Sequence, residues 1–247
     1  MKRAFTLIEL LVVVAIIGIL CVLMAPALIA SRVAASKAMS AQTLHQLLAA
    51  GQGYLGDHSN TFWQYCDDNS DPDGRQWWFG FETWDSVWGA PEGQRICDYS
   101  KGPLGPYTMT AGGIKSDPAF LQYAPRLKPK YKDGNYGYGY NVDLVGMNSM
   151  RVQNYSQIIV FATCAQVNTF EAPASPSNPM IEEFYWIDET QTTIHFRHGG
   201  HALAAFLDGS VRSLDMATDM VPGSLDPNIP TADIGRLPAC YFRQSDW

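Results

Sequence analysis

The sequence predicts an α+β fold in which one long N-terminal helix packs on an antiparallel β-sheet with a large loop-rich insertion. Two patterns lead to this prediction. Residues 5–54 have helical character, with a first half that is apolar all round, and residues 192–215 alternate like strands joined by tight turns. Between them, residues 55–150 show no sustained period and are rich in Gly, Pro and aromatic residues, as expected of an insertion.

Composition narrows the class of function. The 247 residues include 17 Lys+Arg and 24 Asp+Glu, a formal net charge of −7. Nucleic-acid binding needs a concentrated basic face, so we predict no nucleic-acid partner. An aromatic content of 12% is too high for an intrinsically disordered chain.

The N-terminal segment is long enough to cross a membrane. Leu10 to Ala30 contains no charged residue and would form a helix about 31 Å long, which matches a bilayer core. Lys2 and Arg3 precede it, so the N-terminus is predicted in the cytoplasm and the head outside. A cleaved secretory signal usually has a shorter apolar region, which favours retention; a plain single-pass anchor is the other alternative.

Glu9 is the residue that a plain anchor leaves unexplained. A carboxylate at the centre of a membrane helix costs about 2.5–3.5 kcal/mol. Either Glu9 stays solvated near the headgroups or it has a partner within the apolar environment.

The residues around Glu9 favour a partner. Ala4 to Leu10 reads AFTLIEL, and Gly18 and Pro26 follow. This stretch of about 30 residues closely resembles the N-terminus of type IV prepilins and type II secretion pseudopilins. The resemblance implies that prepilin peptidase cuts between Ala4 and Phe5 and that the new amine is methylated. The family usually has Gly where this chain has Ala4, a departure that concerns the efficiency of the cut.

The resemblance also assigns roles within the helix. It implies that the Glu9 carboxylate pairs with the Phe5 amine of a neighbouring subunit and sets the packing register, because an unpaired carboxylate in an apolar core is costly. Gly18 would permit close helix approach, and Pro26 would kink or locally melt the helix. The alternative for both is the general tolerance of Gly and Pro in membrane helices.

The helical pattern continues beyond the membrane as an amphipathic segment. We expect one helix from about Thr6 to Ala50, ended by Gly51 and Gly53. The predicted organisation is a leader 1–4, an assembly helix 5–30, an amphipathic helix 31–54 and a head 55–247. The predicted apolar face of the second half is formed by Val33, Met39, Leu44, Leu47 and Leu48.

The insertion offers two candidate binding features. Five of the seven Trp lie between Trp63 and Trp88; we expect them to fill a loop-rich core, with stacking on sugar rings as the alternative. Asn69, Asp71 and Asp73 precede Gly74 like the first half of a calcium loop. Gly80 stands where a complete EF-hand loop has its Glu, so a solvated acidic turn is the alternative, and no other cofactor is expected.

The C-terminal half is predicted to be β. Residues 192–197, 201–207 and 210–214 form an expected three-strand meander, which strand 158–164 joins, and 135–141 is either a strand or a loop. Asp208-Gly209 predicts a type I′ turn with positive φ at both residues. His198 followed after nine residues by Asp208-Gly209 resembles the His-x9-Asp-Gly domain of many prepilin-like proteins.

Two further hypotheses concern the histidines and cysteines. We expect His198 to hydrogen-bond the Asp208-Gly209 turn; a metal site with His195 and His201 is the alternative. Exported cysteines can form disulfides, and the pairing closest in the chain is Cys66–Cys97. The disulfide candidates are Cys66, Cys97, Cys164 and Cys240, while Cys21 is expected to be a small apolar residue of the membrane segment.

The predicted function is structural. The resemblance implies a subunit of a type IV pilus-like or type II secretion pseudopilus-like filament, made as an inner-membrane prepilin with its head in the periplasm. Its partners would be other pilin-like subunits and prepilin peptidase/N-methyltransferase. No motif of a known catalytic class is present, so an enzyme is not predicted. The alternatives are a tethered binding protein for a glycan or protein and, third, a tethered enzyme with an unrecognised site.

Overall fold

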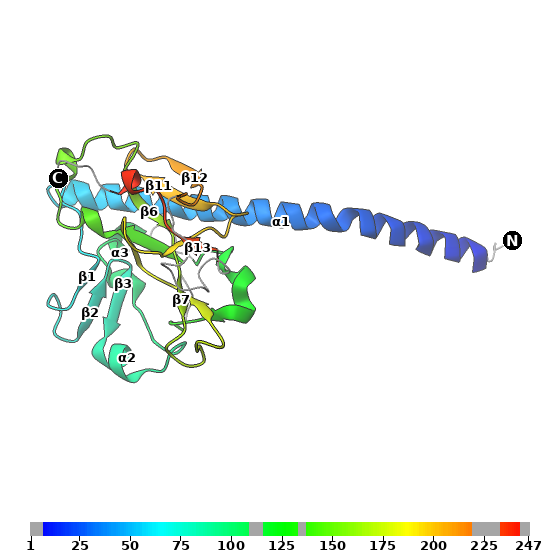
Figure 1. Cartoon of the computed structure of the whole chain (residues 1–247), viewed down its shortest axis with the longest axis horizontal. Helices are drawn as coiled ribbons and strands as arrows, with labels where there is room; N and C mark the ends of the chain where they lie inside the picture. Colours follow the sequence, from blue (N-terminus) through cyan, green and yellow to red (C-terminus); the bar gives the residue numbers. More distant parts are fainter. Residues whose placement is uncertain (1–6, 109–115, 133–136, 219–232, 243–247) are drawn as a thin grey trace.

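A computed structural model describes residues 7–108, 116–132, 137–218 and 233–242. One helix, α1 (Leu7–Asp57), runs through the head and then projects from it as a long stalk (Figure 1). The head contains a five-stranded mixed sheet and three smaller sheets. This is the pilin-like α+β arrangement that the sequence predicts.

The buried half of α1 lies in the head and contacts β6 (Ile159–Thr163) and β11 (Ala202–Phe206). Leu44, Leu47 and Leu48 are at most 6% exposed, because spacings of three and four residues place them on one helix face. Val33 and Met39, predicted on the same face, are half exposed at 50% and 55%, since they lie where the helix leaves the head.

The predicted end of the helix at Gly51 and Gly53 is wrong, because α1 continues to Asp57. Both glycines instead make room for aromatic rings. A Cβ on Gly51 would stand 2.8 Å from Cη2 of Trp63, and one on Gly53 would stand 2.7 Å from Cδ1 of Tyr107. The helix is also continuous through Pro26, so no local melting occurs there.

The three central strands of the main sheet are buried on both faces, whereas an edge strand is partly exposed. Its strand order is β12 (Val211–Leu214), β11, β6, β5 (Tyr138–Asn141) and β9 (Trp186–Ile187); only the β5–β9 pair is parallel. Alternate residues of β11 face opposite sides. Leu203 and Ala205 pack in the core that contains the α1 leucines, whereas Ala204 and Phe206 pack in a second cluster with Leu237 and Phe242.

The predicted meander is correct for β11, β12 and β6, but its first strand is wrong. Strand β10 (Ile194–His195) pairs with β13 (Ile234–Gly235) and not with β11. Thr163 of β6 stands between the two segments. Its hydroxyl donates to the His195 carbonyl at 2.9 Å and accepts from the Leu203 amide at 3.2 Å.

The turn at Asp208-Gly209 also differs from the predicted type I′ turn. Gly209 has φ +88°, whereas Asp208 does not have a positive φ. The Gly209 amide donates to the Phe206 carbonyl at 2.9 Å, and the Phe206 amide donates to the Ser210 carbonyl at 2.8 Å. These bonds define a three-residue loop in which a type I turn is followed by a left-handed glycine.

The remaining elements come from the insertion and from the C-terminal half of the chain. Strands β1 (Cys66–Asp67), β2 (Gly74–Trp77) and β3 (Gly80–Thr83) make one sheet, followed by α2 (Trp84–Gly89). Another sheet contains β4 (Leu127–Lys128), β8 (Met180–Glu182) and β7 (Gln166–Asn168). The short helical turns are η1 (Tyr99–Lys101), α3 (Gly105–Thr108), η3 (Phe120–Arg126), η4 (Val142–Leu144), η5 (Ser149–Arg151) and η7 (Ala239–Tyr241).

Aromatic side chains fill the core between α1 and this insertion. Trp63 and Trp78 are at most 1% exposed, which confirms the core-filling interpretation for these two residues. Of the two alternatives for the Gly/Tyr alternation, a strand or a loop, the structure has a strand over residues 138–141. A Cβ on Gly139 would stand 2.7 Å from Cγ2 of Ile187, so the glycine lets the neighbouring segment approach closely.

Candidate functional site

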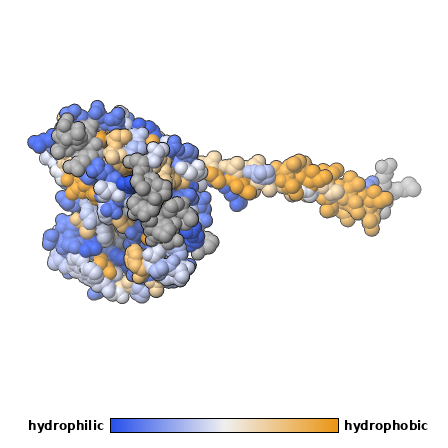
Figure 2. Space-filling model, viewed as in Figure 1, coloured by the Kyte–Doolittle hydropathy of each residue, from blue (hydrophilic) through white to orange (hydrophobic). Residues whose placement is uncertain are grey.

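The most unusual surface of the molecule is the free half of α1. Its large apolar side chains remain exposed, from 45% at Val13 to 79% at Leu7, and form one continuous apolar stalk (Figure 2). Within the described residues, α1 is the one helix long and apolar enough to cross a membrane. An apolar surface this large requires a lipid or protein environment, because its exposure to water is energetically unfavourable.

The predicted assembly residues occupy different places on this stalk. Glu9 lies near the N-terminal end of the described part of α1. Gly18 has open space beside it, since a Cβ there would meet no atom within 4 Å. Pro26 lies inside the continuous helix. Ala4 and Phe5, the predicted processing residues, lie outside the described part of the chain.

A buried ionic cluster joins the stalk to the head. Ser40 of α1 donates from Oγ to Oδ1 of Asp117 at 2.5 Å, and Arg197 donates from Nε to Oδ2 of Asp117 at 2.8 Å. The side chains of Asp117 and Arg197 are both 0% exposed. Burial alone would raise the pKa of Asp117, but the Arg197 guanidinium outweighs it and holds this pKa below its ordinary value.

Arg197 uses its remaining donors on the head. Nη1 donates to Nδ1 of His195 at 2.9 Å and approaches the Cys164 carbonyl at 3.4 Å, and Nη2 donates to the Gly137 carbonyl. Because Arg197 has only donors, Nδ1 of His195 accepts. The guanidinium therefore links three segments of the head to the carboxylate that Ser40 contacts.

The sequence does not predict this cluster. Ser40, Asp117 and Arg197 are separated by about 80 residues at each step, and none belongs to a motif with a spacing that predicts contact. Arg197 directly precedes His198, which is the only hint in the sequence.

The His-x9-Asp-Gly residues mark the two ends of one strand. His198 precedes the turn at Gly199 and Gly200, which have φ +70° and +84°, before β11 begins. Asp208 follows β11, and its Oδ1 accepts from the amide and hydroxyl of Ser210 at 2.9 and 2.6 Å. The spacing therefore measures a five-residue strand and its two turns.

His198 consequently does not reach the Asp208-Gly209 turn, and that expectation is wrong. Its amide donates to the His201 carbonyl at 3.1 Å, and its Nε2 lies 3.7 Å from Oδ2 of Asp117. His201 instead lies 2.7 Å from Asp215 through Nδ1 and Oδ1. The side chains of the three histidines therefore contact different residues: Arg197 for His195, Asp117 for His198 and Asp215 for His201.

The predicted calcium segment is an exposed turn. Oδ1 of Asp71 accepts from the Asp73 amide at 2.9 Å, and the Asn69 amide donates to Oδ1 of Asp67 at 2.8 Å. Asp68 is engaged by Arg75 at 2.5 Å. These contacts fit the solvated acidic turn, and calcium at Asn69, Asp71 and Asp73 stays a prediction.

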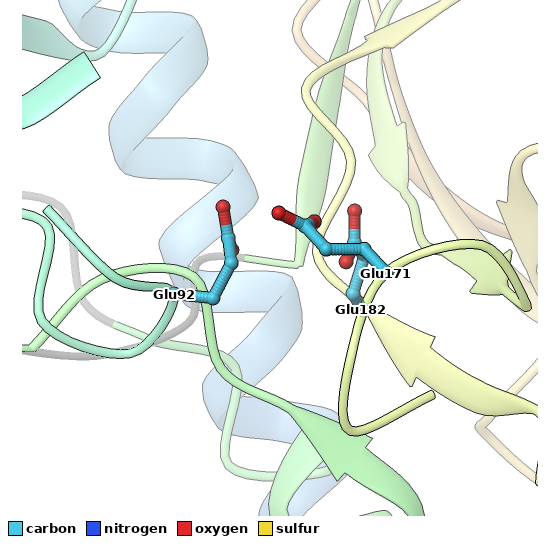
Figure 3. Close-up of side chains that lie close together, drawn as sticks. All are labelled: Glu92, Glu171 and Glu182. Atoms are coloured by element: carbon cyan, nitrogen blue, oxygen red, sulfur yellow. The ribbon is translucent and has the colours of Figure 1, made fainter. Parts of the chain in front are cut away.

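A different set of carboxylates converges in the described part of the chain. Glu92, Glu171 and Glu182 have oxygens within 4.8 Å of one another, and their side chains lie close together (Figure 3). Lys128, 1% exposed, places its Nζ 3.4, 2.9 and 3.0 Å from these three carboxylates. Burial lowers the pKa of Lys128, but its hydrogen bonds to Glu171 and Glu182 outweigh this and raise the pKa. The ammonium therefore offsets part of the negative charge of the three carboxylates. Lys130 at 3.2 Å from Glu182 and Arg95 at 3.3 Å from Glu92 offset more of it.

The predicted disulfide candidates are all free, so the Cys66–Cys97 pairing is wrong. Each thiol has its own surroundings: Cys66 Sγ lies 3.7 Å from Oδ1 of Asp68, and Cys164 Sγ donates to the Trp186 carbonyl at 3.6 Å. Burial raises the pKa of Cys66 and Cys164 to about 12 and that of Cys97 further. Cys240 is exposed on η7, and Cys21 is exposed on the stalk.

Comparison with known proteins identifies only the N-terminus. Residues 1–25 match the family model described as the prokaryotic N-terminal methylation motif. No curated protein and no solved structure matches the chain. The chain therefore carries a prepilin-type N-terminal signal, which continues into the exposed apolar half of α1.

Proposed function

We propose that the protein is a subunit of a type IV pilus-like or type II secretion pseudopilus-like filament. The observation that carries the proposal is the wholly exposed apolar half of α1, which directly continues a methylation motif. In the inner membrane this surface contacts lipid. In a filament, the same surfaces of many subunits pack together and exclude water.

Maturation prepares the helix for this packing. Prepilin peptidase removes residues 1–4, including Lys2 and Arg3, and leaves a methylated amine on Phe5. The Glu9 carboxylate then pairs with the Phe5 amine of a neighbouring subunit, which fixes axial register. The open space beside Gly18 admits a neighbouring helix to close range.

The head follows the helix because the two are joined rigidly. The contact from Ser40 to Asp117 lies in the buried cluster held by Arg197. Just outside it, half-exposed Val33 and Met39 line a hollow of about 400 Å³ with Pro118 and Ala119. This hollow continues the apolar surface of the stalk beyond the membrane. A neighbouring subunit packs against it in the filament.

The decisive measurement is mass spectrometry of the mature full-length protein from its native membrane. We expect the chain to begin at methylated Phe5; a chain that still begins at Met1 contradicts the proposal. Glu9→Gln should abolish recovery of the protein in sheared filaments, because the charge pair is lost. Gln52→Ala, an exposed change on the same helix, is the matched control and should leave assembly unchanged.

The second candidate is a membrane-tethered binding protein that never polymerises. The observation that favours it is Trp88, a large aromatic side chain that is 76% exposed on the head. The Glu9→Gln variant separates the candidates, because a tethered binder keeps its ligand whatever residue stands at position 9. In both candidates the role is assembly or binding, and we propose no catalytic step.

A further inference from the structure

An ordered aromatic platform covers one end of the head. Trp84 and Trp88 of α2 stack with ring centroids 6.4 Å apart and planes 14° apart. Trp84 is fixed by its Nε1, which donates to the Pro72 carbonyl at 3.0 Å. Trp88 is 76% exposed. An indole this exposed is unusual, because most large aromatic side chains are at least half buried.

The cationic side chain of Arg75 packs against both rings of the platform. The Arg75 guanidinium lies 5.7 Å from the Trp84 centroid and 6.0 Å from the Trp88 centroid. It is itself fixed by Asp68, which accepts from Nε at 2.5 Å and from Nη2 at 2.8 Å. The two rings are therefore preorganised and lose little conformational entropy when a ligand binds.

A hollow with a mostly apolar lining and a few polar side chains lies beside the platform along the same helix. It has a volume of about 480 Å³, and its lining includes Asp85, Ser86, Gln94, Ile96, Asp98 and Lys101. Asp85 and Trp88 are three residues apart on α2, so they are neighbours on its surface. The hollow offers the carboxylates of Asp85 and Asp98 and the amide of Gln94 near the exposed ring. The buried hydroxyl of Ser86 is already bonded to Glu82 and to the backbone of Ile96.

We propose that Trp88 and this hollow form a binding site for a neutral glycan. The electron-rich face of an indole attracts the polarised C–H bonds of a sugar ring. The carboxylates of Asp85 and Asp98 accept hydrogen bonds from sugar hydroxyls, and the amide of Gln94 both donates and accepts. A flat ring beside polar groups matches the apolar C–H face of a sugar and the hydroxyls on its edge.

Charge selects among glycans. Two carboxylates line the hollow against one ammonium, Lys101, which lies 3.8 Å from Asp98. The chain as a whole has a formal charge of −7. An acidic polysaccharide would be repelled, whereas a chain of neutral hexoses or N-acetylated amino sugars would not.

The position of the site separates it from assembly. Figure 1 places α2 at the side of the head away from α1. A filament built on α1 would leave this end of the head accessible, and so would a subunit that stays single in the membrane. The inference thus goes beyond the filament role and does not depend on it.

The test is isothermal titration calorimetry of the full chain in detergent micelles with cellohexaose, chitohexaose, mannohexaose and the acidic hexamer of galacturonic acid. We expect saturable binding of at least one neutral hexasaccharide and none of the acidic one. Trp88→Ala should weaken binding at least about tenfold, and Asp85→Asn should weaken it less. Phe170→Ala removes another exposed ring, 74% exposed, and should leave binding unchanged.

Three outcomes would overturn the proposal. They are no binding of any neutral hexasaccharide, equal weakening by Trp88→Ala and Phe170→Ala, or preference for the acidic hexamer. Loss of a protein partner on Trp88→Ala without any glycan binding would assign the surface to a protein instead. Circular dichroism melting of both alanine variants shows whether each remains folded.

Discussion

The hydroxyl of Ser40 donates a 2.5 Å hydrogen bond to the carboxylate of Asp117, and this contact joins the long helix to the head at a fully buried point. Arg197 supplies the charge that makes the contact stable, because it engages the other oxygen of the same carboxylate. The stalk and the head are thereby coupled through an ionic cluster rather than through apolar packing alone.

Asp117→Ala should destabilise the protein by about 3–5 kcal/mol, since it leaves the Arg197 guanidinium buried without its partner. Chemical denaturation of the full chain in detergent measures the change. Asp215→Ala breaks an exposed pair between Asp215 and His201. The Asp215 side chain is 85% exposed, so this variant should have little effect on stability. Equal effects of the two variants would contradict a structural role for the cluster.

The Asp117–Arg197 pair makes the stability of the protein depend on pH. The pKa of Asp117 is lowered in the folded state, so the stabilisation is complete above the ordinary aspartate pKa, about 4, and is lost as pH falls below it. The Asp117→Ala penalty should therefore shrink when denaturation is measured at decreasing pH below 4. A penalty that is constant with pH would contradict the charge pairing.

Glu183 should produce the opposite dependence. Burial raises the pKa of this carboxyl to about 8, despite nearby Lys130, whose amide donates to Glu183 Oε1 at 3.2 Å. A raised pKa means that stability is complete below the ordinary glutamate pKa, about 4.3, and falls as pH rises toward 8.

Glu183→Gln should remove this loss. Its stability relative to the wild type should rise between pH 5 and pH 8 by an amount on the order of a few kcal/mol, then level off. Thermal melting at a series of pH values checks this. Glu189→Gln, a surface control on the same part of the chain, should follow the wild type at every pH; a Glu183→Gln curve parallel to the wild type would contradict the prediction.

Lys128 takes the position that a metal ion could otherwise occupy. Lys128→Met should lower stability, because the three carboxylates then lose the cation that contacts all of them. Lys130 at 3.2 Å from Glu182 and Arg95 at 3.3 Å from Glu92 offset only part of this loss. Millimolar calcium should restore part of the loss in melting temperature, since carboxylate oxygens at this spacing suit calcium. Lys101→Met, at an exposed position, is the control and should respond to calcium as the wild type does. Failure of calcium to help would show that the cluster cannot accept a metal.

The sequence was informative where the signal is local. The apolar run, the buried leucines of α1 and the β11–β12 hairpin each follow from neighbours in the chain, and the methylation motif is a linear pattern. Strand β10 was misassigned because its partner is β13, some 40 residues away, and Thr163 occupies the place between β10 and β11. The Asp117–Arg197 cluster escaped for the same reason: contact across 80 residues has no local trace.

Alanine substitutions at Gly51 and Gly56 test why helix α1 continues through its glycine positions. Both lie in α1, and alanine is intrinsically the better helix former by about 1 kcal/mol. At Gly56 a Cβ would meet nothing within 4 Å, so Gly56→Ala should stabilise the protein by about 0.5–1 kcal/mol. At Gly51 a Cβ would stand 2.8 Å from Cη2 of Trp63, which is 1% exposed and cannot move aside. Gly51→Ala should therefore destabilise by about 1–3 kcal/mol, and denaturation curves in which both variants stabilise alike would show that the Trp63 contact does not require glycine.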